Sequence, residues 1–542
     1  MQQREGQLVD VHLRKIYPAR VTWSDGVITA IAPIAQSDGP YILPGFVDAH
    51  VHIESSMVVP SEFARLAVRH GTVGTVSDPH EIANVLGVAG VSFMIENGKK
   101  VPFHFAFGAP SCVPATKFET SGAEINAAGV TQLLAMPEVR YLAEMMNYPG
   151  VLQRDPEVMA KLVAAQAAGK PIDGHAPGLT GKDAEQYAAA GISTDHECFT
   201  LDEALYKAKL GMKILIREGS AARNFDALIP ILNQFPDQVM FCSDDKHPDS
   251  LLEGHINLLV AKAVQQGYDL FEVLRAASVH PVEHYRLPIG LLRPGDGADF
   301  IMVDDLEHFN TLETWINGQC VAQNGESKIG RVPIETPNQF RCELQSPEAF
   351  RVQNRGTILR AIKALDGELI TKQVLEPPLI RDGFAVCDTQ RDLLKIAVIN
   401  RYAKGDPQVA FIQGFGIQNG AIASCVAHDS HNIIAVGTDD ALIAKAVNLI
   451  VDHRGGVSAV THDEQKVLPL PVAGIMSDGD GFQVADAYQS IDEFARQTLG
   501  SPLRAPFMTL SFMALLVIPD LKLSDKGLFS GKQFEFVSLF NE

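Results

Sequence analysis

The chain is poor in cysteine, poor in positive charge and free of long apolar runs, and each shortage excludes a class of protein. Its seven cysteines show no paired spacing, which is typical of reduced thiols in a cytoplasm. No apolar run reaches the ~18 residues that a membrane span needs. Residues Met1–Gln7 lack the apolar stretch of a signal peptide. We therefore expect a cytoplasmic protein with no membrane partner.

Basic residues are outnumbered, with 45 Lys and Arg against 65 Asp and Glu, which gives a formal net charge of −20. A nucleic-acid partner wants a basic patch, so the balance argues against one and leaves small molecules as the expected partners. The Gly-rich stretch 413–420 lacks the lysine and the spacing of a phosphate loop, and we interpret it as turns. A hydrophobic content of 46% is ample for packed cores, and 542 residues suggest roughly three domains.

Two separate stretches share the alternating pattern of short β-strands. Apolar and polar residues alternate from Val9 to Leu13, and Ser24-Asp25-Gly26 is a hairpin turn signal. A similar strand-like pattern is found again at 298–303 and 314–321. We predict that both flanks pair into one small β-rich domain made of residues 1–43 plus 295–345.

The middle of the chain alternates strand-like and helix-like segments. Helical segments are predicted at 61–70 and 155–168, between strand candidates. The eight strand candidates end near His50, Asp78, Gly108, Glu144, His175, His196, Glu218 and Asp244. This alternation predicts an α/β fold, a (β/α)₈ TIM-like barrel over residues 44–294, with its chemistry at the C-terminal strand ends. Residues 346–542, which include a predicted helix at 439–453, are expected to form a C-terminal α+β domain.

The most informative motif is the His-x-His at the end of the first barrel strand candidate. Side chains alternate along a strand, so His50 and His52 project to the same side. Two imidazoles on one side of a strand end can hold one divalent metal ion. Alone, such a pair is as often two ordinary surface or core histidines.

Other metal-ligand residues follow at the ends of later strand candidates. Each has a common alternative by itself: a solvated glutamate, a turn histidine or a helix-capping aspartate. Together they predict a centre of two divalent ions, with Glu144 as the bridging carboxylate. The expected ligands are His50, His52, Glu144, His175, His196 and Asp244. Such ions lower the pKa of a bound water to near neutrality, and Asp244 can take that water's proton and return it to a leaving group.

With these residues in place, the chain resembles the adenine deaminase family of the amidohydrolase superfamily. The stretches that carry the resemblance are 43–57, 76–84, 173–178, 242–246, 426–433 and 468–474. The resemblance implies that a metal-bound hydroxide attacks C6 of adenine and releases hypoxanthine and ammonia, with Mn²⁺ or Fe²⁺ as the metal and zinc as a further option. We also expect a homo-oligomer of at least two copies.

The resemblance also implies that Asp78 and Glu81 face the purine. Attack at C6 pushes electrons onto a ring nitrogen, which a carboxyl group with a raised pKa can protonate. The alternative for Asp78 is capping of a helix that begins near Pro79. Ser55 and Ser56 are expected to line the pocket, with loop capping as their alternative.

Several residues and functions stay open at this point. Arg217 is a candidate for substrate contact, and His428 and His431 are interpreted as pocket-edge or structural residues. One other function is a hydantoinase- or dihydroorotase-like amidohydrolase acting on a cyclic amide, although such enzymes commonly bridge their metals with a carboxylated lysine where this chain has Glu144. The other is a non-catalytic scaffold of the same fold, which would have no need to keep Asp244.

Overall fold

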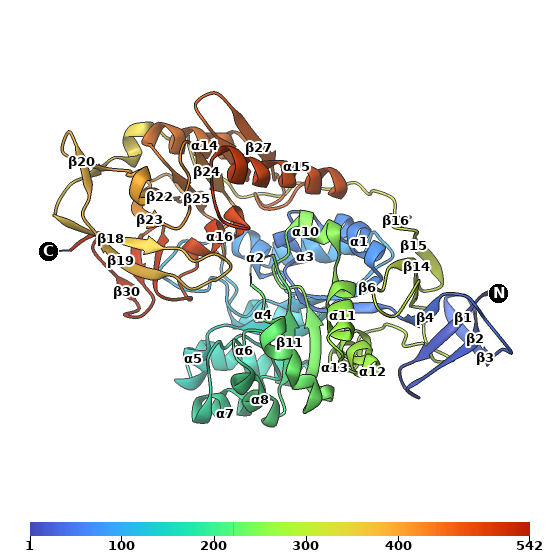
Figure 1. Cartoon of the computed structure of the whole chain (residues 1–542). Coiled ribbons are helices and arrows are strands. Elements are labelled where there is room, and N and C mark those ends of the chain that lie inside the picture. Colours follow the sequence, from blue (N-terminus) through green and yellow to red (C-terminus); the bar gives the residue numbers. More distant parts are fainter. Residues whose placement is uncertain (221, 542) are drawn as a thin grey trace.

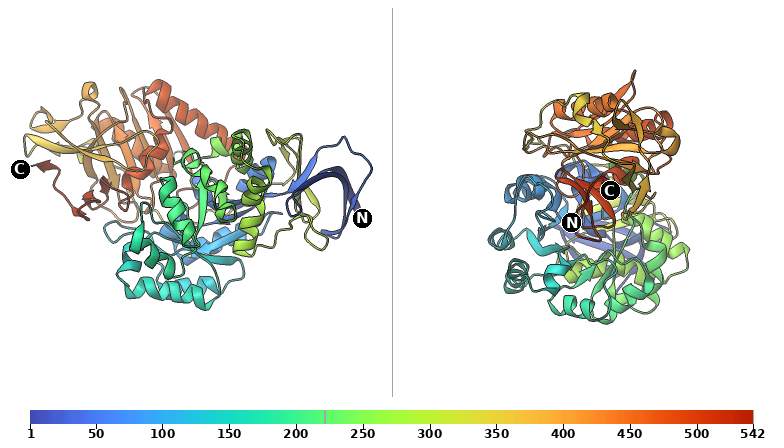
Figure 2. Two further views of the ribbon diagram at one scale, coloured as in Figure 1. Left: turned by 60° about the horizontal axis from the view of Figure 1, so that its bottom comes forward. Right: turned by 90° about the vertical axis from the view of Figure 1, so that its left-hand side faces the viewer.

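The computed structural model describes residues 1–220 and 222–541 and contains three parts. A small β-sheet lies at one end, a barrel of strands and helices lies in the middle, and the C-terminal part packs along one side of the barrel (Figure 1). A turned view shows the N-terminal sheet and the C-terminal strands at opposite ends of the molecule (Figure 2). No helix in the described ranges combines the length and the apolar character needed to cross a membrane.

The small sheet joins the two flanks of the barrel, and strand β4 makes the join. β4 pairs in parallel with β1 and antiparallel with β13, so it lies between the N-terminal strands and those that follow the barrel and joins both into one sheet. The predicted hairpin turn is present, because β2 ends at Ser24, β3 begins at Val27, and Asp25 and Gly26 have positive φ. The strands are β1 (Gln2–Asp10), β2 (Lys15–Ser24), β3 (Val27–Pro33), β4 (Tyr41–Pro44), β13 (Phe300–Val303), β14 (Thr311–Ile316), β15 (Gln319–Gln323) and β16 (Glu326–Ser327).

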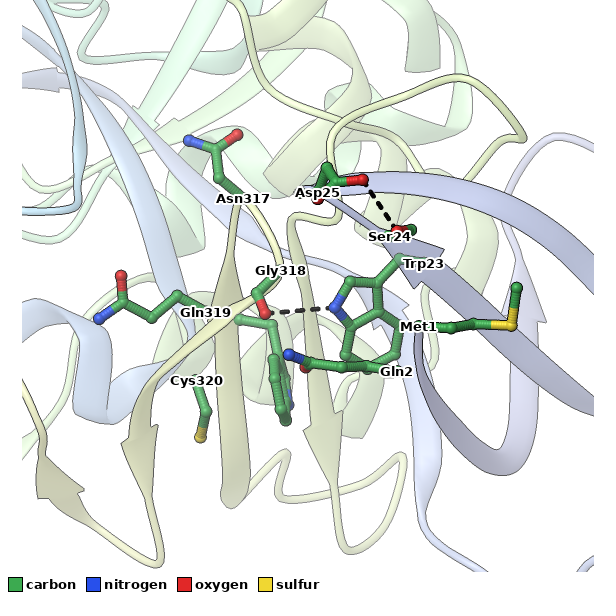
Figure 3. A pocket seen from close by; sticks show the side chains of 11 residues that line it. Met1, Gln2, Trp23, Ser24, Asp25, Asn317, Gly318, Gln319 and Cys320 are labelled. Atoms are coloured by element: carbon green, nitrogen blue, oxygen red, sulfur yellow. Dashed lines mark hydrogen bonds between the residues drawn. The ribbon is translucent and has the colours of Figure 1, made fainter.

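Three aromatic rings form the centre of this sheet's own core. Trp23 lies edge-on to Trp315 and Phe300 with centroids 5.0 and 5.2 Å away, and Phe300 stacks on Trp315. The indole of Trp23 donates to the backbone oxygen of Gly318 at 3.2 Å. A hollow at the surface beside Trp23 is bordered by Met1 and the 317–320 turn (Figure 3).

The predicted (β/α)₈ barrel is confirmed, with every strand ending within two residues of its predicted end. The strands pair in parallel as β5 to β9 and as β10 to β12. Backbone hydrogen bonds connect the two groups: Ser193 N donates to Ile172 O at 2.9 Å, and Asp244 N donates to His50 O at 2.9 Å. The strands are β5 (Phe46–Val51), β6 (Thr72–Ser77), β7 (His104–Ala109), β8 (Val139–Met145), β9 (Ile172–Gly174), β10 (Thr194–Asp195), β11 (Lys213–Arg217) and β12 (Val239–Cys242).

Helices cover the outside of the barrel strands. The helix predicted at 155–168 is α6 (Pro156–Ala167), and Asp155 caps it by accepting from the backbone N–H of Glu157 and Val158. The helix predicted at 61–70 is α1 (Pro60–Ala67) followed by a 3₁₀ turn to His70. Further helices are α2 (His80–Leu86), α3 (Val88–Gly98), α4 (Ala127–Leu134), α7 (Gly181–Ala189), α8 (Leu201–Lys209), α10 (Pro248–Glu253), α11 (Ile256–Gln265), α12 (Leu270–Leu274) and α13 (His280–Tyr285).

The C-terminal part is a mostly antiparallel sheet buried on both faces. Along β22, Ala397 and Ile399 face helix α14, whereas Ile396 and Val398 face the main core, as the two-residue period of a strand requires. Its main elements are β18 (Ile358–Lys363), β19 (Lys372–Glu376), β22 (Leu394–Ile399), β23 (Gln408–Gln413), β24 (Ala421–Ser424), β25 (Ile433–Gly437), α14 (Asp440–His453), β26 (Gly456–Val460), β27 (Gln465–Pro469), α15 (Gly481–Glu493), α16 (Pro506–Ser511), β28 (Leu521–Ser524) and β29 (Gly527–Ser530).

The C-terminal part is fixed to the barrel by backbone and charged contacts around α1. Ser477 N donates to Met57 O at 2.8 Å, and Gly481 N donates to the buried carboxylate of Glu62 at 2.9 Å. The guanidinium of Arg65 reaches Asp480 at 2.8 Å. Residues of the C-terminal part also line the pocket at the C-terminal ends of the barrel strands, so this part covers the mouth of the barrel.

Both tryptophans of the sequence lie in the small sheet, so tryptophan fluorescence reports on that part alone. Replacing the buried Phe300 by alanine should lower the stability of the small sheet by about 3–5 kcal/mol, because a ring is lost from a packed core. The measurement is urea unfolding followed by tryptophan emission. Phe199→Ala, at a barrel residue that is 47% exposed, is the matched control. An unchanged midpoint for Phe300→Ala would contradict the packing described here.

Candidate metal centre and substrate pocket

Closure of the barrel places three of the predicted ligands side by side. His50 lies in β5 and His52 follows one residue past its end, still in extended backbone, so both rings point to the same side and their Nε2 atoms are 3.2 Å apart. The backbone of Asp244 lies between them: its N–H donates to His50 O at 2.9 Å, and its carbonyl accepts from His52 N at 3.3 Å. The carboxylate oxygen Oδ1 of Asp244 is consequently 3.5 Å from His50 Nε2 and 3.3 Å from His52 Nε2.

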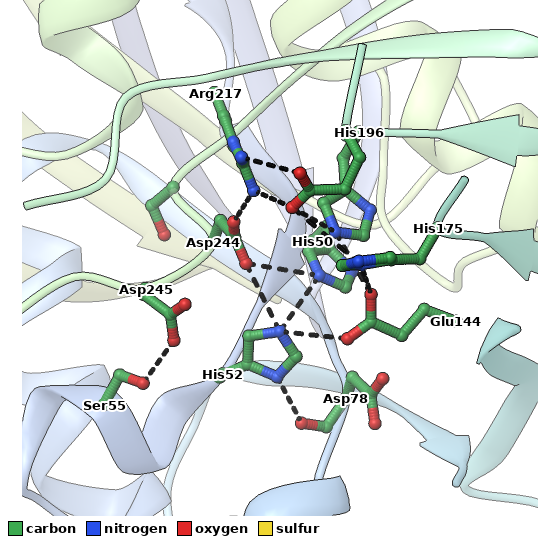
Figure 4. Close-up of polar contacts among 12 residues, drawn as sticks. His50, His52, Ser55, Asp78, Glu144, His175, His196, Arg217, Asp244 and Asp245 are labelled. Atoms are coloured by element: carbon green, nitrogen blue, oxygen red, sulfur yellow. Dashed lines mark hydrogen bonds and ion pairs between the residues drawn. The ribbon is translucent and has the colours of Figure 1, made fainter. Parts of the chain in front are cut away.

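Glu144 at the end of β8 connects this group to a second one (Figure 4). Its Oε1 lies 3.5 Å from His52 Nε2, while its Oε2 lies 2.7 Å from His175 Nδ1 and 3.1 Å from His196 Nε2. The structure therefore brings together all six predicted ligands, with Glu144 between the two groups.

The donor atoms of these groups fit divalent metal ions. Ligand atoms ~2.1 Å from one ion are ~3.0–3.5 Å from each other, which is close to most of the separations found here. Imidazole and carboxylate are the ligands that Mn²⁺, Fe²⁺ and Zn²⁺ accept, and every one of these side chains is buried. His50, His52 and Asp244 would hold one ion and His175 and His196 the other, with Glu144 shared.

Buried charges behind the ligands hold two of the strand ends in place. The ammonium of Lys207 on α8 donates to Asp195, to Glu203 and to the backbone oxygen of Ala176, each at 2.7 Å. Asp195 precedes His196 and Ala176 follows His175, so one lysine ties together the two segments that carry these ligands. Because Lys207 is fully buried, both of its carboxylate partners are needed to offset its desolvation.

Arg217 at the end of β11 is bonded to carboxylates, in a way that the sequence did not reveal. Its guanidinium binds Asp244 and also Glu197. Nη2 of Arg217 donates to Oε2 of Glu197 at 3.0 Å. Burial alone would raise the pKa of Asp244, but Arg217 and hydrogen bonds from His50 and His52 outweigh it and hold that pKa well below its usual range. Asp244 is therefore ionised, as a ligand and proton acceptor must be. Glu197 was missed, although its place directly after His196 could have suggested it.

A pocket opens beside these ligands, and residues from two parts of the chain line it. The barrel contributes His52, His80, Glu81, Glu144, Met146, His175, His196, Glu197, Arg217, Asp244 and Asp245. The C-terminal part contributes Leu369, His428, Asp429, Phe512, Leu515 and Ile518. One side of the pocket is thus charged and the other largely apolar, which suits a flat heteroaromatic molecule.

Asp78, Ser55 and Ser56 do not line this pocket within the described residues. Asp78 is not among the lining residues: its Oδ1 accepts from the backbone N–H of His80 at 3.1 Å and its Oδ2 lies 3.2 Å from His80 Nδ1, while the N-cap position of α2 is held by Pro79. Ser55 is one step removed, since its hydroxyl donates to Asp245 at 2.5 Å. The hydroxyl of Ser56 donates to the carbonyl of Ile53 in its own 3₁₀ turn (Ile53–Ser56).

Glu81 lines the pocket, but its expected raised pKa is wrong. Burial alone would raise that pKa, yet the imidazoles of His428, His431 and His80 outweigh it and hold it well below its usual range. His428 and His431 come from the C-terminal part and both contact the Glu81 carboxylate. No sequence pattern indicates this contact, because the partners are 347 residues apart or more.

Comparisons with known proteins agree with this arrangement. The model of the amidohydrolase family matches residues 41–321, which span the barrel and strands on either side of it. The model of the adenine deaminase C-terminal domain matches residues 368–535. Together the two regions contain all of the pocket residues named above.

Curated relatives match over nearly the whole length of the chain. A protein named adenine deaminase from Salinibacter ruber is 58% identical over 99% of this chain and 98% of its own length. Proteins of the same name from Sulfurovum sp. (strain NBC37-1) and Methanosarcina barkeri are 56% and 51% identical, over 98% and 100% of both chains respectively. The similarity therefore covers the barrel, the small sheet and the C-terminal part alike.

The described geometry predicts two metal ions per chain. Elemental analysis of protein produced with added manganese should give two ions for the parent and a loss of at least one for Glu144→Gln, because Glu144 contacts both groups. Glu218→Gln, one residue past the end of β11 and not a ligand, should keep both. One ion or none in the parent protein would contradict the two-ion centre.

Proposed function

We propose that this chain, which belongs to the adenine deaminase family of the amidohydrolases, deaminates adenine in the pocket between the barrel and the C-terminal part. It converts adenine and water into hypoxanthine and ammonia. The observation that carries this function is the placement of the six ligand residues and of the C-terminal wall around one pocket, in a chain 58% identical to a named adenine deaminase.

We propose Mn²⁺ or Fe²⁺ as the resident pair, with zinc as a further option. When bound, such ions lower the pKa of water to near neutrality. The protein's own contribution is to hold the ligands rigid and to exclude bulk water: His50 and His196 stack with centroids 4.1 Å apart, and both are buried.

Asp244 is the proposed proton carrier on the nucleophile side. Its ionised carboxylate accepts a proton from the attacking water and later gives one to the departing amino group, since an amide ion is too basic to leave. Arg217 fixes the carboxylate through Oδ2, which leaves Oδ1 directed toward His50 and His52. The same contact keeps Asp244 from resting in the protonated form.

Glu81 is the proposed acidic residue on the purine side. Attack at C6 moves the electron pair of the C6–N1 double bond onto N1, which must then gain a proton. Glu81 lies in the pocket in contact with three imidazoles. Its negative charge favours protons on these imidazoles, next to the purine ring. Asp78 and Ser55 are proposed to act indirectly, Asp78 through His80 and Ser55 through Asp245.

The other two functions have less support. A cyclic-amide hydrolase of the hydantoinase type would be expected to bridge its metals with a modified lysine, whereas Glu144 occupies the bridging position here. A non-catalytic scaffold has no need for the Arg217–Asp244 contact.

We further propose that the protein is cytoplasmic and forms a homo-oligomer. Each chain has three proposed domains: residues 1–43 plus 295–345, residues 44–294 and residues 346–542. The free state of all seven cysteines supports a reducing compartment. The pairing of β4 with β13 supports the first domain. Phe340 and Cys342, near its proposed C-terminal boundary, pack against the core of the third domain. Sedimentation analysis of the purified chain tests the oligomeric state.

Adenine should be deaminated and adenosine should not. Phe512, Leu515 and Ile518 of the C-terminal part line the pocket, and we expect this apolar wall to leave no room for a ribose on N9 of the purine. The measurement is ammonia release from both compounds at equal concentration, with the two metals confirmed present. Comparable turnover of adenosine would contradict the closed pocket.

Glu81→Gln should keep both metals and lose turnover by about 10²-fold or more, because the amide carries no charge to hold protons on the neighbouring imidazoles. Ammonia release and elemental analysis are measured together on the same preparation. Glu96→Gln, on the exposed face of α3, is the matched control and should behave as the parent does. Near-parental turnover of Glu81→Gln would show that Glu81 takes no part in the reaction.

A further inference from the structure

The loop between β24 and β25 brings a histidine of the C-terminal domain into the barrel's pocket. His428 lies in this loop, is only 2% exposed and lines the pocket together with Phe512. The ring of Phe512 stacks on its imidazole with centroids 4.8 Å apart and an interplanar angle of 15°. The packing fixes the plane of the imidazole, so its two nitrogens point in defined directions.

The two ring nitrogens of His428 have different surroundings. Nδ1 is hydrogen-bonded to Oε1 of Glu81. Nε2 is buried and has no hydrogen-bond partner among the described residues, with Asp245 the nearest acid at 3.8 Å. A buried polar atom without a partner costs about 1–3 kcal/mol, so its retention at a pocket wall points to a ligand atom that completes it.

A histidine that binds a carboxylate through one nitrogen and has no protein partner on the other can act as an acid or a base. The carboxylate orients the ring and stabilises its cationic form, and the second N–H is presented to the substrate. Burial alone would lower the pKa of His428, but Glu81 and Asp245 outweigh it and raise it to about 9. The imidazole therefore carries both protons at neutral pH.

The neighbouring histidine does not share this arrangement. His431 contacts the other oxygen of Glu81 through Nε2, and its Nδ1 accepts from the backbone N–H of Ala427 at 3.2 Å. Both nitrogens of His431 thus face protein groups. Its role is to position Glu81, and His428 is the histidine with a nitrogen directed at the pocket.

We propose that His428 is a catalytic residue of the deamination, which donates the proton on Nε2 to a ring nitrogen of adenine. The proposal rests on the adenine deaminase function. As water attacks C6, the electron pair of the C6–N1 double bond moves to N1, the N1–H bond forms and the Nε2–H bond breaks. That hydrogen stays on N1 of hypoxanthine. Of the two protons of water, one leaves on ammonia and the other restores the imidazole.

This assignment gives the C-terminal domain a chemical part in the reaction. The barrel supplies the metal ligands and Asp244, and the C-terminal domain supplies the proton for the ring. Glu81 on the barrel and His428 on the C-terminal domain contact each other only when the two domains are packed together, so the donor is assembled by that packing.

The test uses the full-length, metal-loaded protein and begins with the parent. If the parent does not release ammonia from adenine, the proposed function fails and the catalytic role of His428 fails with it. With an active parent, His428→Ala should keep two metals and lose about 10²- to 10⁴-fold in kcat. Added imidazole should restore part of the loss by entering the space of the deleted ring. His247→Ala is the control, since His247 is a buried histidine that also contacts the C-terminal part, through the Tyr488 hydroxyl at 2.5 Å.

The control variant should respond differently, with a lower melting temperature and no gain from imidazole. A second variant, His428→Gln, keeps an N–H donor and most of the volume but has no transferable proton. It should bind hypoxanthine within a few-fold of the parent while losing kcat to the same extent as His428→Ala. A parental kcat in His428→Gln, or a loss in His428→Ala that imidazole does not change, would overturn the proposal and make His428 a packing residue.

Discussion

The site depends on the closure of the barrel between its first and last strands. Asp244 donates its backbone N–H to His50 O and accepts from His52 N, so the hydrogen bonds that close the cylinder also set the register of three side chains. Parallel strands have one C-terminal edge, and curling the sheet into a barrel brings the first strand end next to the last. Residues almost 200 positions apart therefore meet through backbone geometry before any metal is bound.

The second constraint is the packing of the C-terminal domain across the barrel mouth. It brings an apolar wall and His428 to the pocket, and it brings His431 into contact with Glu81. Lys522, fully buried on β28, supports this wall by donating to the backbone oxygens of Leu369 and Phe512 at 2.7 and 2.8 Å. Both of these residues line the pocket, so the lysine holds the wall from behind.

The sequence was sufficient for the parts of the structure that follow a local rule. Two-residue alternation and the βα repeat predicted all eight barrel strands, and the strand-end rule predicted His50, His52, Glu144, His175, His196 and Asp244, which converge. It was insufficient where distant segments decide the chemistry. The protonation of Glu81 was predicted wrongly because His428 and His431 belong to another domain. Glu197 was passed over because one acid beside a motif is usually unremarkable. Asp78 was expected to face the purine, but it is not among the residues that line the pocket, and its carboxylate contacts the backbone and the ring of His80.

We propose that barrel closure places an ionised Asp244 where it can move protons for the water that attacks adenine. The most direct measurement is single-turnover deamination by Asp244→Asn protein in which both metals have been confirmed. The amide keeps the shape but removes the basic oxygen, so we expect a rate loss of about 10²- to 10⁴-fold in a folded protein. Asp245→Asn serves as the neighbouring comparison and should lose less. A rate for Asp244→Asn within a few-fold of the parent would contradict the account and assign the proton transfer to another residue.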